Sequence, residues 1–205
     1  MVGRGSFEIF NQGRAIGLLR WELQGGHNLQ NALAAIAAAQ AAGVDPKQAI
    51  QTLARFKGVR RRMELRGTAA GVAVWDDFAH HPTAIATTVS GLRDQVGKAR
   101  ILAVLEPRSS TMKAGLMKDR LPASLEQADR IFCFSANLGW DAAAALAPLG
   151  DRARIESDLE RLVGVIVAEA QPGDQVLVMS NGGFGGIHER LLASLSIRAG
   201  LATGA

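Results

Sequence analysis

The sequence predicts an α/β protein built around a mostly parallel sheet. Short apolar runs without clear polar alternation, typical of strands covered on both faces, stand at 72–75, 101–105, 130–134 and 175–179. Helical patterns follow or separate them, at 83–96, about 112–127, 141–147, 157–170 and near 187–196. This alternation is that of βαβ units, whose crossovers place parallel strands side by side and helices over the sheet.

The residues ahead of this alternation predict a smaller set of elements. Residues 7–23 form two apolar stretches around a turn at Asn11-Gln12-Gly13, which indicates a hairpin too small to bury its own apolar face. An alanine-rich helix is expected from Asn28 to Ala42, and Pro46 opens a second helix that runs to about Phe56. Residues 62–66 add a strand that pairs with 72–75 across Gly67.

Composition narrows the class of protein. The 205 residues, 48% hydrophobic and 20% charged, suffice for one or two soluble cores. The net charge of +4 allows an anionic ligand, and the basic run at 57–62 has no aromatic stacking platform, so nucleic acid is the weaker interpretation. Cys133 stands alone in an apolar run and is expected to be a buried thiol. No signal peptide opens the chain and no apolar run reaches the roughly 18 residues of a membrane span, so a cytoplasmic protein is expected.

A polar stretch directly after the first predicted strand is the most informative part of the chain. Asp76 and Asp77 end that strand, and His80 and His81 precede the helix that Pro82 opens. Ligands of open α/β sheets bind at the carboxyl ends of strands, so a binding edge is predicted here. The alternative is that Asp77 or Thr83 caps the helix and the histidines are solvated. A metal site is disfavoured, because adjacent side chains point apart and no third ligand stands at suitable spacing.

Five motifs extend this pattern along the chain. They are Gly26-His27-Asn28-Leu29-Gln30-Asn31, Phe56-Lys57-Gly58-Val59-Arg60-Arg61-Arg62-Met63-Glu64, Asp76-Asp77-Phe78-Ala79-His80-His81-Pro82-Thr83, Glu106-Pro107-Arg108-Ser109-Ser110-Thr111-Met112-Lys113 and Met179-Ser180-Asn181-Gly182-Gly183-Phe184-Gly185-Gly186. Together they resemble the Mur ligases, the ATP-dependent amide ligases of peptidoglycan synthesis, over residues 1 to about 197. The resemblance implies a Rossmann-like C-terminal domain at 57–197, the tail of a central ATP-binding domain at 1–56 and a flexible tail at 198–205.

The last two motifs most resemble the family members that act in murein recycling, where UDP-N-acetylmuramate is joined to L-alanyl-γ-D-glutamyl-meso-diaminopimelate. The resemblance implies a reaction that uses ATP and Mg²⁺ and passes through an acyl phosphate. The phosphate-binding sequence Gly-x-x-x-x-Gly-Lys-Ser/Thr is absent from these residues. We therefore expect an incomplete ligase, inactive alone, whose partners are the N-terminal and central domains, which also supply most of the Mg²⁺ ligands.

The resemblance assigns nucleotide contacts to particular residues. Asn28 and Asn31, one helical turn apart, align with the asparagines that bind adenine, and Asp77 aligns with the acid that holds the ribose hydroxyls. Arg62 aligns with the arginine that reaches the γ-phosphate, although Met63 stands where the family usually has phenylalanine. Without the resemblance, an asparagine at a helix start is simply an N-cap.

Two loops are expected to bind the peptide beside this nucleotide site. His80 and His81 are expected to hydrogen-bond substrate or phosphate during the reaction. The loops after the strands at 101–105 and 175–179 should emerge on the same edge, so the resemblance places the peptide against five residues. They are Arg108, Ser110, Asn181, Gly182 and Gly183. The alternative is that residues 180–186 are only a tight turn into the last helix and that Arg108 is a surface charge.

Other functions remain open at this point. One is a non-catalytic module that binds a nucleotide or peptide, and another is a ligase of the type that joins UDP-muramate to L-alanine. A dinucleotide-dependent oxidoreductase is disfavoured, because the glycines at 182–186 do not fit Gly-x-Gly-x-x-Gly and follow the last strand. Residues 54–62 are expected to form a hinge between the two predicted domains.

Overall fold

The computed structural model describes residues 6–21, 23 and 26–203. Residues 1–5, 22, 24–25 and 204–205 lie outside the described residues, and with them small parts of the predicted first domain, hairpin and tail. The chain divides between Val59 and Arg60 into two compact units.

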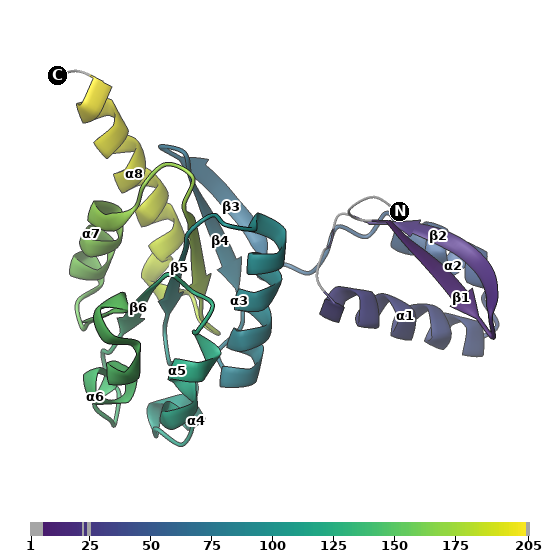
Figure 1. Cartoon of the computed structure of the whole chain (residues 1–205), viewed down its shortest axis with the longest axis horizontal. Helices are drawn as coiled ribbons and strands as arrows, with labels where there is room; N and C mark the ends of the chain where they lie inside the picture. The colour runs from purple at the N-terminus through teal and green to yellow at the C-terminus, as the bar shows by residue number, and fades with distance from the viewer. Residues whose placement is uncertain (1–5, 22, 24–25, 204–205) are drawn as a thin grey trace. The chain divides into compact units, whose positions relative to one another are not determined.

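The first unit is a hairpin packed against two helices (Figure 1). Strands β1 (Ser6–Asn11) and β2 (Arg14–Arg20) are antiparallel, and the turn residues Gln12 and Gly13 both have positive φ, 49° and 78°, which suits a two-residue hairpin turn. Helices α1 (Gly26–Ala41) and α2 (Pro46–Leu53) complete the unit. Its buried core consists of Ile9, Leu19, Trp21, Ala32, Ile36 and Ile50.

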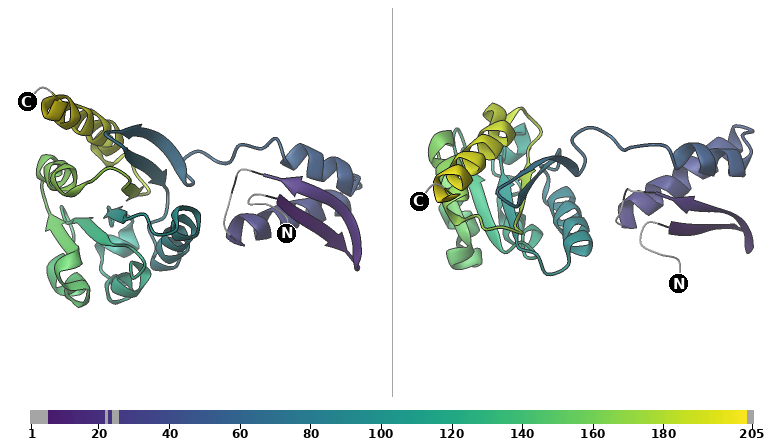
Figure 2. Two further views of the ribbon diagram at one scale, coloured as in Figure 1. Left: turned by 45° about the horizontal axis from the view of Figure 1, so that its top comes forward. Right: turned by 90° about the horizontal axis from the view of Figure 1, so that it is seen from above.

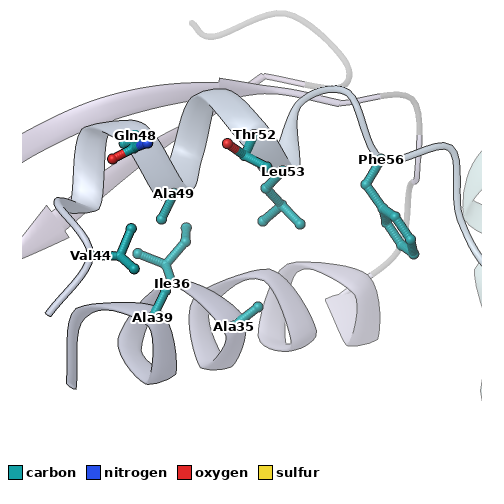
Figure 3. A pocket seen from close by; sticks show the side chains of 9 residues that line it. All are labelled: Ala35, Ile36, Ala39, Val44, Gln48, Ala49, Thr52, Leu53 and Phe56. Atoms are coloured by element: carbon teal, nitrogen blue, oxygen red, sulfur yellow. The ribbon is translucent and has the colours of Figure 1, made fainter. Parts of the chain in front are cut away.

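An apolar groove runs between the two helices of this unit (Figure 3). Its volume is about 340 Å³, and Ile36, Val44, Leu53 and Phe56 are among the side chains that line it. The groove leaves part of the apolar surface of α1 and α2 uncovered within the first unit.

The second unit is built on a six-stranded sheet with the order β3-β4-β8-β5-β6-β7. The strands are β3 (Glu64–Ala69), β4 (Val72–Asp77), β5 (Ile101–Leu105), β6 (Arg130–Phe134), β7 (Ala153–Glu156) and β8 (Gln175–Met179). β3 is antiparallel to β4, and the other neighbouring pairs are parallel. The predicted α/β class with a mostly parallel sheet is therefore confirmed.

Helices cover both faces of this sheet (Figures 1 and 2). One face carries α3 (Pro82–Val96), α4 (Ser110–Lys113), α5 (Leu121–Ser124) and α6 (Ala142–Leu146). The other carries α7 (Leu159–Glu169) and α8 (Ile187–Thr203). Short 3₁₀ turns at Lys118–Arg120, Ala147–Arg152 and Phe184–Gly186 complete the chain. Along β5, Ile101 and Ala103 pack into the first face and Leu102 and Val104 into the second, which explains an apolar run without alternation.

Some elements differ from the sequence-based predictions. The helix expected over about 112–127 is broken, because Gly115 takes a φ of +75° after α4 and Pro122, which lacks an N–H, stands in the first turn of α5. Strand β7 was not predicted, because Arg154 and Glu156 interrupt its apolar character. The turn between β3 and β4 lies at Ala70 and Gly71, whereas Gly67 sits within β3 at a register shift.

The end of the chain is helical where a flexible tail was expected. α8 continues to Thr203, and the guanidinium of Arg198 donates a hydrogen bond to the carbonyl oxygen of Val167 near the end of α7. This bond satisfies a carbonyl that has no partner within α7. Among the residues described, no helix is long and apolar enough to cross a membrane.

Candidate functional site

The carboxyl ends of three adjacent strands define one edge of the sheet. β8 lies between β4 and β5, and Met179 is in register with Asp77 on one side and Leu105 on the other. The segments that leave this edge are 78–81, 106–109 and 180–186, so the loops predicted to carry the site do emerge together. An edge of this kind is where α/β sheets bind ligands.

Ser180 ties these segments to one another. Its backbone N–H donates to the carbonyl oxygen of Asp77 at 3.1 Å, and its hydroxyl donates to a carboxylate oxygen of Glu106. The same hydroxyl oxygen accepts from the backbone N–H of Gly182 at 2.9 Å. Ser180 is buried, so these bonds fix the start of the glycine-containing loop relative to both neighbouring strands.

Arg61 reaches this loop from the segment ahead of β3. Its Nη2 donates to the carbonyl oxygens of Ser180 and Gly182 at 2.6 and 2.7 Å, and its Nε lies 3.3 Å from the carboxylate of Asp76. The Asp76 side chain is buried and also lies 3.3 Å from Arg66 and 3.4 Å from the imidazole of His188. A buried carboxylate with two partly exposed arginines as partners thus lies directly behind the loop.

His188, on the first turn of α8, is the member of this cluster whose pKa is shifted. Burial lowers the pKa of its imidazole below the ordinary value, and the neighbouring Asp76 carboxylate opposes that shift by raising the pKa. Burial therefore favours the neutral form of the imidazole.

Asp77 organises the turn from β4 into α3. One of its carboxylate oxygens accepts from the backbone N–H of Met63 at 2.9 Å, and the other accepts from the N–H of Ala79 at 2.8 Å and the hydroxyl of Thr88 at 3.2 Å. Its side chain is only 2% exposed. A carboxylate has about four lone-pair sites, so that of Asp77 can accept one further hydrogen bond. The predicted contact with ribose hydroxyls would therefore use a carboxylate that already stabilises the fold.

The two histidines have separate local roles. His81, rather than Asp77 or Thr83, is the N-cap of α3, and its Nδ1 accepts from the backbone N–H of Thr83 at 3.4 Å. His80 Nδ1 lies 3.0 Å from the carbonyl oxygen of Phe78, and because a carbonyl only accepts, Nδ1 is the donor; in a neutral imidazole this tautomer leaves Nε2 as an acceptor. No cluster of three or more metal-binding side chains occurs among the described residues.

Arg62 points its charge outward. Its guanidinium carbon lies 5.7 Å from the centre of the Phe78 ring, and the side chain is exposed. The structure gives it no hydrogen bond or ion pair with any described residue. An exposed guanidinium held by a ring contact is free to bind an anion.

Arg108 is similarly available at the other predicted loop. It is exposed, forms no ion pair or hydrogen bond within the described part of the chain, and lies against Gly182. The side-chain oxygen of Asn181 is buried without a hydrogen-bond partner among the described residues. Ser110 and Gly183 are exposed nearby in sequence, Ser110 as the first residue of α4.

Not every predicted site residue belongs to this edge. Asn28 and Asn31 lie on α1 in the first unit, Asn28 half-buried and Asn31 exposed. Sequence reasoning overlooked Arg61 and Asp76 as site residues. The paired aspartates and the run of arginines were visible signals, but nothing in the sequence shows which member of each pair faces inward.

Comparison with known proteins identifies the relatives of this arrangement. The profile of the Mur ligase, glutamate ligase domain matches residues 61–182. The UDP-N-acetylmuramate–L-alanyl-γ-D-glutamyl-meso-2,6-diaminoheptandioate ligase of Escherichia coli (strain K12) is 50% identical over 195 residues, covering 94% of this chain and 43% of that protein. A UDP-N-acetylmuramate–L-alanine ligase of Mycobacterium sp. (strain JLS) is 34% identical over 191 residues, covering 88% of this chain and 39% of that protein.

A solved structure supports the same assignment. The crystal structure of a murein peptide ligase from Psychrobacter arcticus 273-4 superposes with a TM-score of 0.72 at 38% identity, covering 96% of this chain and 43% of that one. The chain thus spans less than half the length of each of these three proteins. Because the family profile covers most of the second unit, including the edge that carries Arg61, Asp76 and Asp77, the chain belongs to the Mur ligase family.

Proposed function

We propose that this chain is the C-terminal part of an ATP-dependent ligase that joins UDP-N-acetylmuramate to L-alanyl-γ-D-glutamyl-meso-diaminopimelate. The observation that carries the proposal is the 50% identity, over 94% of this chain, with the Escherichia coli ligase named for that reaction. The match covers 43% of that relative, and activity is proposed to require residues equivalent to its remaining part. The phosphate-binding sequence, which does not occur in these 205 residues, is expected there.

The residues of the carboxyl edge suit this reaction. Mur ligases use ATP and Mg²⁺. The exposed guanidinium of Arg62 fits a phosphate group, with Asn28 and Asn31 proposed for adenine and Asp77 for ribose. Most Mg²⁺ ligands are proposed to belong to the N-terminal and central domains of the whole ligase.

The peptide is proposed to lie on the neighbouring loops. Its several carboxylates require a cationic partner, and Arg108 supplies one that no described residue neutralises. Asn181 and Ser110 would add hydrogen bonds, and Gly182 and Gly183 let the backbone approach the ligand.

His80 presents Nε2 as an acceptor, and His81 holds the first turn of α3 in place. ATP would convert the muramyl carboxylate into an acyl phosphate, which the alanine amine attacks with release of phosphate.

Domain movement is part of the proposal. The unit boundary between Val59 and Arg60 falls within 54–62, the segment expected to act as a hinge that brings Arg62 and Asp77 onto ATP. The assignment of 1–56 to a central ATP-binding domain, and the cytoplasmic location, remain predictions.

A chimaera tests the proposed substrates. The part of the Escherichia coli ligase that precedes the match is joined to this chain, and phosphate release is measured with UDP-N-acetylmuramate, ATP, Mg²⁺ and either the tripeptide or L-alanine. We expect release that depends on the tripeptide. Stimulation by L-alanine alone would instead support the second candidate, which the 34% identity with an L-alanine ligase favours.

The controls separate the remaining alternatives. The intact Escherichia coli ligase shows that the assay works, and a thermal shift with UDP-N-acetylmuramate shows that the chimaera is folded. A folded chimaera that is inactive with both acceptors supports a non-catalytic binding module. The 205-residue chain alone should release no phosphate above background, and strong tripeptide-dependent release from it would contradict the idea of an incomplete ligase.

A further inference from the structure

Arg61 is placed as a connector rather than as a ligand-binding group. Its guanidinium is half-buried and donates to the carbonyl oxygens of Ser180 and Gly182, while Nε faces Asp76. All of its hydrogen bonds therefore point into the protein. Arg62, the next residue, has the opposite arrangement, since its guanidinium is exposed.

The backbone holds Arg61 in this position at some conformational cost. Its φ is +58°, in the left-handed region that side chains other than glycine rarely adopt. Two hydrogen bonds compensate: its N–H donates to the Glu64 carboxylate at 2.8 Å, and its carbonyl accepts from the N–H of Phe78 at 2.8 Å. Because the backbone N–H and the carbonyl of Arg61 are both hydrogen-bonded, the strained conformation is held and the side chain leaves the backbone in one direction.

The buried carboxylate behind Arg61 fixes its guanidinium. Asp76 is 1% exposed, and a buried carboxylate needs opposite charge and hydrogen bonds. Arg66 lies at the same distance from it as Arg61, 3.3 Å, but extends on to Glu189 on α8. Among the residues that the structure describes, Arg61 is the one that contacts both the Asp76 carboxylate and the carbonyl oxygens of the loop after β8.

We propose that Arg61 is a positioning residue that holds the turn at 180–182 and the adjacent phosphate-binding Arg62 in one fixed arrangement. This inference rests on the proposed function for the roles of Arg62 and the peptide loop. Because a guanidinium forms a planar fork of donors, it can hold two carbonyl oxygens and a carboxylate at once, which a lysine ammonium on a flexible stem does less well. The peptide side and the phosphate side of the edge would then move together.

Hydrogen exchange of the 205-residue chain tests the structural half of this proposal without any assay of activity. In Arg61→Met, the amides of Ser180 and Gly182, which donate to Asp77 and to the Ser180 hydroxyl, should exchange at least tenfold faster. The amide of Leu177, within β8, reports whether the whole sheet has been destabilised.

Arg93 offers a matched control at the opposite edge of the sheet. Its guanidinium donates to the carbonyl oxygens of Gly97, Ala99 and Gln127 and pairs with Asp129 at 2.5 Å, so Arg93→Met removes a comparable set of bonds. We expect it to leave Ser180 and Gly182 unchanged relative to Leu177. Unchanged exchange in Arg61→Met, or an equal rise in Arg93→Met, would overturn the proposal.

Kinetics of the chimaera test the functional half. Arg61→Lys should raise the KM for the tripeptide at least fivefold and also lower kcat, because Arg62 loses its fixed position, and Arg61→Met should change both values further. If the KM for ATP rises instead while hydrogen exchange is unchanged, Arg61 binds phosphate directly and the positioning role is wrong. A chimaera that is inactive with the native Arg61 refutes the proposed function and leaves the exchange result as the test of positioning.

Discussion

The guanidinium of Arg108 lies directly against the α-carbon of Gly182. A β-carbon built on this glycine would stand 1.6 Å from Nη1 of Arg108 and 2.6 Å from Cζ, distances that no structure tolerates. Gly182→Ala should therefore displace Arg108. Because Arg108 is an exposed, flexible side chain, the cost in stability should be small. In the chimaera we expect the KM for the tripeptide to rise in the same direction as in an Arg108 variant.

The neighbouring glycine is a suitable control for that substitution. A β-carbon on Gly183 meets nothing within 4 Å, and its φ of −76° suits alanine. Gly183→Ala should leave the tripeptide KM close to that of the native protein. Equal effects of both substitutions would show that the loop itself, and not the placement of Arg108, determines the KM.

Loss of the Arg108 charge should weaken peptide binding directly. Arg108→Ala should raise the tripeptide KM by roughly tenfold or more, as expected when a charge-assisted hydrogen bond of about 1.5–3 kcal/mol is removed. Steady-state kinetics with varied tripeptide measure the change, and a urea titration confirms that the variant is folded. Unchanged tripeptide kinetics in a folded variant would place the peptide elsewhere.

Arg62 should act mainly in turnover. If its guanidinium reaches the γ-phosphate only after closure about 54–62, Arg62→Ala should lower kcat far more than it weakens UDP-N-acetylmuramate binding. Kinetics of the chimaera and a direct titration with UDP-N-acetylmuramate give the two values. An equal loss in both would argue against closure.

Asp77 should contribute to folding as well as to any nucleotide contact. Asp77→Asn replaces one acceptor oxygen by a donor, so an N–H of Met63 or Ala79 loses its partner, at a cost of about 1–3 kcal/mol. The midpoint of urea unfolding should fall accordingly. Asp94→Asn, on the exposed side of α3, serves as the control and should change little. Native stability in Asp77→Asn would show that the carboxylate is kept for the ligand alone.

His188 predicts how stability depends on pH. Burial lowers the pKa of its imidazole in the folded protein, whereas in the unfolded chain the pKa is about 6.5. Below 6.5 the unfolded state therefore binds more protons, so this contribution to stability is complete above pH 6.5 and is lost as the pH falls toward the lower folded pKa. Urea unfolding of the native chain and of His188→Gln between pH 8 and 5 should show a weaker dependence in the variant. Parallel curves would refute this assignment.

The sequence predicts the fold well where local pattern and burial agree. β5, β6 and β8 have the predicted bounds, and their mostly apolar sequences reflect that both faces of those strands are covered. β7 escapes prediction because an edge strand with Arg154 and Glu156 lacks that pattern. Cys133 is buried as expected from its apolar run, and burial raises the pKa of its thiol to about 12.

The site is less predictable because it depends on contacts that are distant in sequence. Arg60, Arg61 and Arg62 are equivalent by composition, and only the fold turns Arg61 inward toward carbonyl groups 119 and 121 positions away. Asp76 and Asp77 are likewise indistinguishable in the sequence, yet one pairs with arginines and the other accepts backbone N–H groups. The family resemblance points to Arg62 and Asp77 but carries no information about the partners behind them.

The antiparallel direction of β3 determines where the chain enters the second unit. Glu64, at the start of β3, pairs with Asp76, near the carboxyl end of β4, so the polypeptide arrives at the very edge that carries the candidate site. A parallel first strand would have brought it in at the far edge, a strand length away. As a result, only a few residues separate the covalent joint at Val59 and Arg60 from Asp77, whose carboxylate accepts the N–H of Met63. A rotation at that joint would displace the side chains of the site by only a short distance, because they lie close to the joint. The opposite edge of the sheet would be displaced much further by the same rotation.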